Sequence, residues 1–308
     1  MQKLPDFPWD LLAPYGDKAK KHPDGFIDLS QGTPVDATPK FIQDALSKAS
    51  NSPSYPLTAG SEELRAAIKD FAIKTLGVTG EFDVLPTIGS KELIALLPTF
   101  LQSKTVLYPA VAYPTYLVGA LMASAQPTPV EIDATTWPVA DLAWVNSPSN
   151  PTGQVQSSEQ LLAAINWARK NNSILASDEC YLSFTTTGKS ILALSGGNNS
   201  GLLAVHSLSK RSNLAGYRAA FLIGDSKLID QIRQIRKHAG LMVPLPVQQA
   251  MIAALSENKH AQEQAQRYLA RGVKLKSALV NAGFTIEHSE AGLYIWCTKG
   301  EDGFKTVD

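Results

Sequence analysis

The sequence predicts an α/β protein built around a largely parallel β-sheet. From about Gly60 onward, short apolar runs rich in Val, Ile and Leu alternate with longer segments of helical period, as in folds that alternate strands with helices. Polar residues follow most of the apolar runs, which is typical of parallel strands that end at one ligand-binding edge. The 308 residues suffice for one large or two modest domains with a sizeable core.

Strands are expected where short runs are rich in β-branched and other apolar residues. These runs are residues 84–88, 105–108, 142–146, 174–177, 202–206 and 219–223. Most of them alternate with helices or long loops, so we expect a mostly parallel sheet that is buried on both faces.

The clearest helix follows Ser61, a residue type that caps helix N-termini, and carries apolar residues at helical spacing from Leu64 to Leu76. A second helix is expected at residues 158–170. After about residue 256 the pattern changes to a long polar helix at 259–282, followed by a strand at 293–297.

This change of pattern suggests two domains. We interpret residues 36–256 as a large domain and residues 257–308 as a smaller α+β domain that is incomplete at its C-terminal end. Residues 1–35 are interpreted as an N-terminal segment that packs with the small domain.

Composition excludes several classes of protein. The 28 basic residues balance 28 acidic ones, and 44% of the chain is hydrophobic, so neither disorder nor binding to nucleic acid is expected. The first ten residues contain two prolines and two aspartates, which disfavours a signal peptide. No run of about 18 apolar residues predicts a membrane span. With only two cysteines, Cys180 and Cys297, the cytoplasm is the expected location.

Polar clusters follow five of the expected strands, and they should converge on one crevice at the carboxyl edge of the sheet. The clusters are residues 89–92, Tyr113, residues 147–153, residues 178–181 and residues 207–210. Taken singly, each has an ordinary explanation. Asp178 could cap a loop, Lys210 could extend to solvent, and Asn150 could belong to a simple turn.

Taken together, these residues suit a phosphorylated aldehyde. Lys210 can form a Schiff base, while nearby hydroxyls and the Arg218 guanidinium can hold a phosphate. Gly89 and Ser90 precede an apolar helix whose N-terminus favours an anion. A carboxylate such as Asp178 can keep a pyridine nitrogen protonated, which makes the ring an electron sink.

At this point the sequence resembles the fold-type I pyridoxal-phosphate enzymes, and among them the class I/II aminotransferases. Four motifs occur in the family's order: YPxxxGxxxLR from Tyr55 to Arg65, NPTG from Asn150, DxxY from Asp178 to Tyr181, and SxSKxxxLxGxR from Ser207 to Arg218. The resemblance covers nearly the whole chain. It implies a large domain with a mostly parallel, seven-stranded sheet, a homodimer with shared active sites, and small amino-acid and keto-acid substrates.

The resemblance also implies roles for individual residues. Lys210, Asp178 and Tyr181 are the implied catalytic residues. Lys210 carries the cofactor and moves the proton, and Asp178 pairs with the pyridine nitrogen. Asn150 and Tyr181 bond the phenolic oxygen of the cofactor, and Tyr113 stacks on its ring.

The phosphate and substrate contacts follow in the same way. The implied phosphate-binding residues are Gly89, Ser90, Lys91, Ser207 and Arg218, with the backbone acting at Ser90 and Lys91. Tyr55 is similar to a tyrosine that reaches the phosphate of the neighbouring subunit, although a core or rim tyrosine is an equal alternative. Gly32, Asn150 and Tyr113 are the implied substrate contacts. No metal is implied, since the five histidines lack metal-ligand spacing.

Weaker similarities point to one subfamily. Residues 5–10, 27–30, 147–153, 241–249 and 289–294 resemble the N-succinyl-diaminopimelate aminotransferases of actinobacterial lysine biosynthesis. The implied reaction transfers an amino group from glutamate to N-succinyl-2-amino-6-oxopimelate.

Other interpretations remain open to different degrees. A carbon–sulfur lyase, or another aminotransferase of the same fold, would use the same cofactor residues. A catalytically inactive pyridoxal-phosphate regulator is disfavoured because Lys210, Asp178 and Tyr181 are all present. Neither GxxxxGK[ST], GxGxxG nor GxSxG occurs, which disfavours P-loop and Rossmann enzymes and α/β-hydrolases.

Family members are expected to continue beyond Asp308 and to carry there an arginine that binds the substrate carboxylate. Arg218 is assigned to phosphate and Arg271 to the polar helix, so neither takes that role. The alternative is that the enzyme binds the carboxylate through Gly32, Asn150 and Tyr113 alone. We favour the first interpretation, under which the chain as given should bind cofactor and transaminate poorly.

Overall fold

A computed structural model describes residues 4–307 of the chain. Its strands are β1 (Asp83–Ile88), β2 (Thr105–Pro109), β3 (Gln126–Val130), β4 (Leu142–Asn146), β5 (Ile174–Asp178), β6 (Leu202–Ser207), β7 (Ala219–Gly224), β8 (Thr285–His288) and β9 (Trp296–Thr298). All six strands expected in the large domain are present, with bounds that differ by at most one residue at each end.

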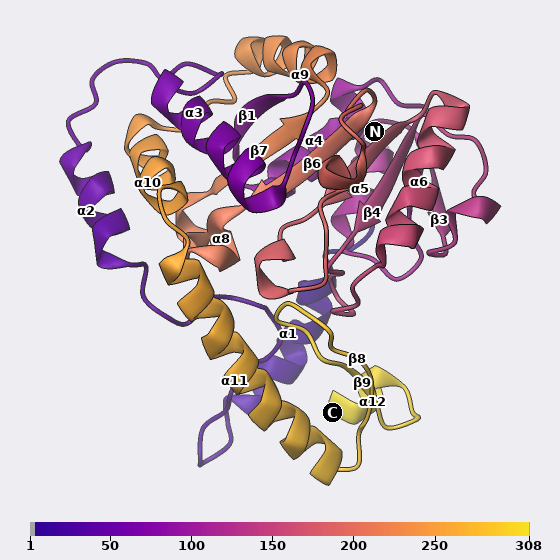
Figure 1. Cartoon of the computed structure of the whole chain (residues 1–308). Helices are drawn as coiled ribbons and strands as arrows, with labels where there is room; N and C mark the ends of the chain where they lie inside the picture. Colours follow the sequence, from indigo (N-terminus) through magenta and orange to yellow (C-terminus); the bar gives the residue numbers. More distant parts are fainter. Residues whose placement is uncertain (1–3, 308) are drawn as a thin grey trace.

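Twelve α-helices lie within the described residues (Figure 1). They are α1 (Pro8–Ala19), α2 (Lys40–Lys48), α3 (Glu62–Phe71), α4 (Ser90–Phe100), α5 (Thr115–Met122), α6 (Ser158–Asn171), α7 (Ile191–Leu194), α8 (Leu208–Arg211), α9 (Ser226–His238), α10 (Leu245–Leu255), α11 (Lys259–Asn281) and α12 (Gly303–Val307). A π-helical turn, η1 (Ala72–Leu76), continues α3, and short 3₁₀ turns occur at η2 (Ala134–Thr136), η3 (Leu182–Phe184) and η4 (Ala215–Tyr217).

The main sheet has seven strands in the order β1-β7-β6-β5-β4-β2-β3. Strands β2 to β6 pair in parallel, which confirms a mostly parallel sheet, but β7 is antiparallel to both β6 and β1. The reversal is possible because residues 208–218 connect β6 to β7 without a crossover to the other end of the sheet. The whole connection therefore stays at the carboxyl end of β6.

Strand β3 was not expected from the sequence, because Pro127 and Pro129 interrupt its run. It lies at the edge of the sheet and pairs only with β2. An edge position tolerates proline, since one side of the strand needs no ladder donors.

Helices cover both faces of the sheet, as expected for a buried parallel sheet. One face packs on α3, α6 and α10 through buried residues such as Ile68, Ile165 and Met251. The other face packs on α4, α5 and α9 through residues such as Leu93, Tyr116 and Ile232. The result is a three-layer domain, with the sheet between two layers of helices (Figure 1).

Local sequence signals explain the ends of the main helices. The Ser61 hydroxyl accepts a hydrogen bond from the Leu64 amide at 3.2 Å, which confirms the expected cap of α3. Ser157 and Gln160 form a capping box at α6, and that helix ends at Asn172 in the left-handed region.

The chain leaves the sheet along α11, which leads to α12 and the β8–β9 hairpin near α1 (Figure 1). Tyr15 of α1 packs against Phe304 of α12, with ring centroids 6.0 Å apart. The predicted strand at 293–297 is wrong in part, because only Trp296–Thr298 is extended and pairs with β8, which was not expected. The preceding loop turns at Gly292, with φ +82°, and carries Tyr294 toward the large domain. The division into domains at residues 36 and 257 remains an interpretation.

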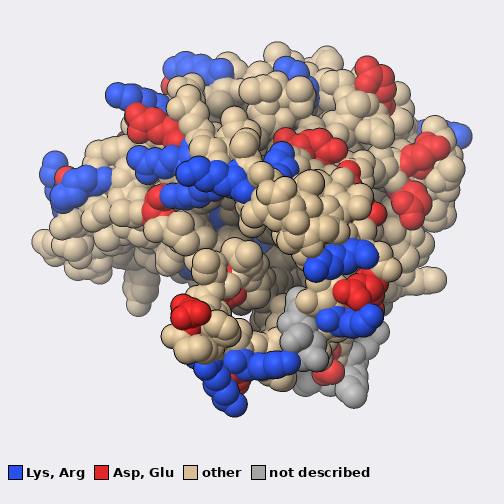
Figure 2. Space-filling view, turned by 90° about the horizontal axis from the view of Figure 1, so that it is seen from below, with Lys and Arg blue, Asp and Glu red and all other residues tan. Residues whose placement is uncertain are grey.

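Arg271 of α11 forms a bidentate pair with Asp36, at 2.6 and 2.7 Å. It therefore fastens α11 to the N-terminal segment, and its guanidinium is already paired with a carboxylate of this chain. Among the described residues no helix is long and apolar enough to cross a bilayer. Basic and acidic side chains are interspersed on the face seen in Figure 2.

Candidate active site

A cavity of about 360 Å³ opens at the carboxyl edge of the sheet. All five polar clusters expected to converge there contribute residues to its wall, together with the N-terminal segment and the loop before β9. The lining residues are Phe7, Trp9, Gln31, Gly32, Thr33, Ser90, Lys91, Ile94, Tyr113, Asn150, Asp178, Cys180, Tyr181, Ser207, Ser209, Lys210, Ala215, Arg218 and Tyr294.

Lys210 lies on α8, a one-turn helix that begins directly after β6. The Ser207 hydroxyl caps this turn by accepting the Ser209 amide at 3.1 Å. The Lys210 ammonium donates to the carbonyl oxygen of Gly32, a residue 178 positions earlier in the chain. Burial lowers the pKa of Lys210, and the nearby Arg218 guanidinium lowers it further. Both effects favour the neutral, nucleophilic amine.

Asp178 ends β5 and is only 5% exposed. Its Oδ2 accepts a hydrogen bond from the Tyr116 hydroxyl at 2.8 Å, and its Oδ1 accepts the Cys180 amide at 3.1 Å. Burial raises the pKa of the Asp178 carboxyl above its ordinary value. Within residues 4–307, no lysine, arginine or histidine forms an ion pair with it. A buried carboxylate at a cavity wall is therefore available to a cationic ligand.

Asn150 is held in place by the strand beside β5. Its backbone amide donates to Asn146 Oδ1 at 2.7 Å, and Asn146 Nδ2 donates to the Asp178 carbonyl oxygen at 3.0 Å. These bonds join the ends of β4 and β5, so Asn150 and Asp178 are fixed relative to one another.

Tyr181 and Tyr294 share a hydrogen bond of 2.7 Å between their hydroxyl oxygens. Their rings also pack edge to face, with centroids 5.4 Å apart. Tyr181 follows β5, whereas Tyr294 comes from the loop before β9. Sequence reasoning did not assign Tyr294 to the site; its only signal was its place in a segment of subfamily resemblance.

Arg218 lies just before β7, with φ +57°, and donates to the Ala215 carbonyl oxygen at 2.8 Å. Gly89 does not line the cavity, but it makes room for this guanidinium. A Cβ at Gly89 would lie 2.1 Å from Arg218 Nη2. The helix α4 then begins at Ser90, so its free N-terminal amides and Arg218 lie at the same end of the cavity.

The rim of the cavity is aromatic and basic. The Lys91 ammonium lies 4.7 Å from the ring centroid of Phe7 and 5.8 Å from that of Trp9. Burial, followed by the charge of Arg218, lowers the pKa of Lys91. Phe7 and Trp9 were missed from the sequence, because nothing local relates residues 7–9 to residue 91.

Of the candidate site residues, Tyr55 and Gly89 do not line this cavity. The Tyr55 side chain is 93% exposed. A role toward the active site of a neighbouring subunit remains a prediction.

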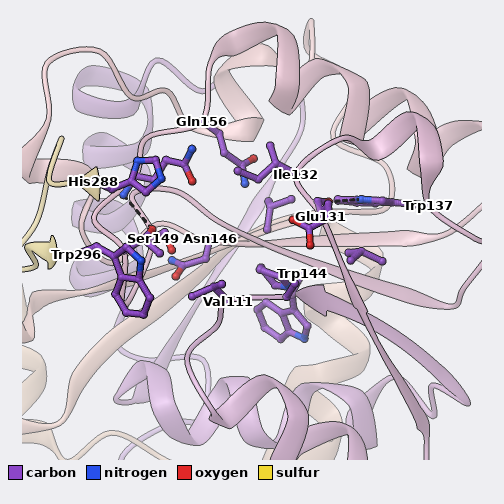
Figure 3. A pocket seen from close by; sticks show the side chains of 16 residues that line it. Val111, Glu131, Ile132, Trp137, Trp144, Asn146, Ser149, Gln156, His288 and Trp296 are labelled. Atoms are coloured by element: carbon purple, nitrogen blue, oxygen red, sulfur yellow. Dashed lines mark hydrogen bonds between the residues drawn. The ribbon is translucent and has the colours of Figure 1, made fainter. Parts of the chain in front are cut away.

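A second cavity of about 330 Å³ lies between the β8–β9 hairpin and the loops after β3 and β4 (Figure 3). Glu131 and Trp137 stand on one side of it, and His288 and Trp296 on the other (Figure 3). Lysine and arginine are absent from its wall within the part of the chain that the structure describes. The groups suited to a phosphorylated aldehyde therefore belong to the first cavity.

Comparison with known proteins identifies the family. The sequence model described as "Aminotransferase class I and II" matches residues 24–302. This chain is a class I/II aminotransferase. Its fold is the fold-type I architecture, and the family depends on pyridoxal 5'-phosphate, as predicted.

Individual relatives agree with this assignment. The aminotransferase is 47% identical to the 4-dedimethylamino-4-oxo-anhydrotetracycline transaminase OxyQ of Streptomyces rimosus, over all of this chain and 88% of that one. It is 46% identical to a probable aminotransferase, Rv1178, of Mycobacterium tuberculosis, over 97% of this chain and 74% of that one. Its structure superposes on a probable N-succinyldiaminopimelate aminotransferase of Thermus thermophilus with a TM-score of 0.88 at 26% identity, covering 97% of this chain and 88% of that one.

The residues that line the cavity have the chemistry needed to bind pyridoxal phosphate. An amine with a lowered pKa suits an aldehyde, and Arg218 with the start of α4 suits a phosphate. A buried carboxylate without a cationic partner among the described residues suits a pyridinium nitrogen.

Proposed function

We propose that this aminotransferase transfers an amino group from glutamate to N-succinyl-2-amino-6-oxopimelate, giving N-succinyl-diaminopimelate and 2-oxoglutarate. We choose an anionic acceptor because the Lys91 ammonium lies at the cavity rim. It rests on Phe7 and Trp9, and within residues 4–307 it forms no ion pair with a carboxylate. A second carboxylate on the acceptor would meet a cation there. The structural likeness to the Thermus thermophilus protein supports the same substrate.

Each site residue has a proposed part in this reaction. When bound, pyridoxal phosphate supplies an electron-withdrawing ring that stabilises negative charge on the substrate carbon. The Lys210 amine would hold the cofactor aldehyde, and its Nζ would accept the proton of the substrate α-carbon. Asp178 would hold the ring nitrogen in its protonated form.

The remaining residues bind and orient. Arg218, Ser207 and the first amides of α4, at Ser90 and Lys91, would bind the phosphate. Asn150 and Tyr181 would donate to the phenolic oxygen, while Tyr113 would stack on the ring. The backbone at Gly32, which contacts Lys210, would lie along the substrate carboxylate.

The test is a panel of keto acids assayed with glutamate as the donor. We expect the highest kcat/KM for N-succinyl-2-amino-6-oxopimelate and a much lower value for pyruvate. Comparable values for acceptors with and without a second carboxylate would contradict the proposal. The variant K210A should abolish turnover, and normal activity of that variant would remove Lys210 from the mechanism.

A second candidate acceptor is a polycyclic ketone of the kind named for OxyQ. The 47% identity to that enzyme and the aromatic side chains of Phe7 and Trp9 at the rim favour it. The same panel should include such a ketone. A lyase is tested in parallel by measuring ammonia release in the absence of any keto acid, since a transaminase releases none.

We also propose a homodimer in which Tyr55 reaches the phosphate site of the neighbouring subunit. Its 93% exposed side chain supports this, since a tyrosine that projects from the surface of one chain is free to contact another.

A further inference from the structure

Tyr116 is a fully buried tyrosine of α5 that sequence reasoning did not assign to the site. Its side chain is 0% exposed. Its ring packs on Trp144 of β4, with centroids 5.1 Å apart, and meets Tyr113 edge to face at 6.0 Å. The ring is therefore held from two sides, which fixes the direction of its hydroxyl.

That hydroxyl points at Asp178. It donates to Oδ2 at 2.8 Å, and a carboxylate oxygen can only accept. Burial, together with the charge of Asp178, raises the pKa of Tyr116 well above its ordinary value. The phenol therefore stays protonated and remains a donor at every pH at which the protein would be assayed.

The second oxygen of Asp178 is also occupied, by the Cys180 amide at 3.1 Å. Each donor disperses part of the carboxylate charge and lowers its affinity for a proton. Cys180 and His206 are the other titratable groups that act on the Asp178 carboxyl, and both lower its pKa. Beyond burial, the Asp178 charge in turn helps to raise the pKa values of Tyr113, Tyr181 and Tyr294, which face it from neighbouring loops.

A proton shared between a carboxylate and a pyridine nitrogen resides on whichever of the two is more basic. We propose that Tyr116 is a positioning residue that weakens the basicity of Asp178 and so keeps this proton on the ring nitrogen of the cofactor. The inference rests on the proposed pairing of Asp178 with that nitrogen. Tyr116 does not touch the reacting atoms; it acts through the carboxylate.

The variant Tyr116→Phe removes the hydroxyl and leaves the packing of the ring on Trp144 and Tyr113. The holoenzyme is prepared with pyridoxal phosphate labelled with nitrogen-15 in the ring, and the chemical shift of that nitrogen is measured by solid-state NMR. We expect the resonance to move from the protonated position toward that of neutral pyridine. Titration of the apoprotein with cofactor, followed by tryptophan fluorescence, should show that the variant still binds pyridoxal phosphate, because the lost hydrogen bond is internal to the protein and does not contact the cofactor.

Three further samples make the result decisive. Asp178→Asn should move the resonance fully to the neutral position. Tyr268→Phe, which removes a buried tyrosine hydroxyl from α11, should leave both measurements unchanged. Replacing Tyr116 with ortho-fluorotyrosine, a stronger donor of nearly the same shape, should keep the ring nitrogen protonated.

The outcomes distinguish a failure of the role of Tyr116 from a failure of the pairing between Asp178 and the ring nitrogen. An unmoved resonance in Tyr116→Phe, with a moved one in Asp178→Asn, would overturn the role of Tyr116. An unmoved resonance in Asp178→Asn would overturn the pairing of Asp178 with the nitrogen, and with it the proposal for Tyr116.

Discussion

Gly89 and Arg218 show how one missing side chain shapes the phosphate end of the site. Gly89 has φ +79°, and a Cβ there would lie 2.1 Å from Arg218 Nη2. We expect Gly89→Ala to displace the guanidinium and to weaken cofactor affinity at least about tenfold, because a charge-assisted contact is worth more than about 1.4 kcal/mol. Fluorescence titration of the apoprotein measures this.

The matched control is Gly240→Ala. That residue also has a positive φ, +71°, and nothing within 4 Å of the added Cβ, so it tests the effect of a strained backbone without the contact. Equal losses of affinity in the two variants would mean that strain alone, and not Arg218, accounts for the effect.

Lys91 is the residue on which acceptor choice should depend. Lys91→Met keeps the length of the side chain and removes its charge. We expect kcat/KM to fall about fivefold for an acceptor with a distal carboxylate and to change little for pyruvate, since one partly exposed ion pair is worth about 1 kcal/mol. Lys91→Arg should restore most of the loss. An equal fall for both acceptors would assign the Lys91 side chain to the phosphate instead.

Among the secondary-structure elements, α11 is fastened to the N-terminal segment by Asp36. This carboxylate accepts from Arg271 and from Gln264, and the pKa of Asp36 falls to about 2, chiefly because of the Arg271 hydrogen bonds. Its folded pKa lies below the unfolded value, so the stabilisation is present above about pH 4 and is lost as the pH falls toward 2. Arg271 is nearly half exposed, so solvent reduces the contribution to about 1 kcal/mol.

We therefore expect Asp36→Asn to lower the free energy of unfolding by about 1 kcal/mol at pH 7, with the difference shrinking below pH 4. Urea unfolding at several pH values measures it. Asp44→Asn is the control, because Asp44 pairs with Lys40 on an exposed helix surface and should change stability by only a few tenths of a kcal/mol. A pH-independent loss in Asp36→Asn would contradict the electrostatic explanation.

At the scale of the whole molecule, the proposed dimer predicts complementation between inactive variants. Lys210→Ala and Tyr55→Phe subunits, mixed by unfolding and refolding together, would form hybrids in which one of the two sites has both native residues. We expect about a quarter of wild-type activity from random pairing of equal amounts. Each variant refolded alone is the control. No recovery, or a monomer in sedimentation, would contradict the shared site.

The sequence alone could predict the large-domain strands, the cap of α3 and most of the cavity wall. Buried strands are short apolar runs, caps are local hydrogen bonds, and the carboxyl ends of parallel strands must meet at one edge. For that reason Lys210, Asp178 and Asn150 were expected together from the sequence, and Arg218 joined them because it ends the loop that carries Lys210. Strand β3 escaped prediction because its two prolines are compatible only with an edge, and the edge is a property of the assembled sheet.

Only the tertiary structure determines which groups that are far apart in the sequence are in contact. Tyr116 reaches Asp178 across 62 positions of sequence, Tyr294 reaches Tyr181 across 113, and Lys210 reaches Gly32 across 178. No period or spacing encodes such pairs, since they depend on how helices pack on the sheet and where the loop before β9 turns. The sequence therefore determined the chemical groups of this aminotransferase, and the packing decided how those groups adjust one another, because pKa values and side-chain orientation depend on neighbours in space.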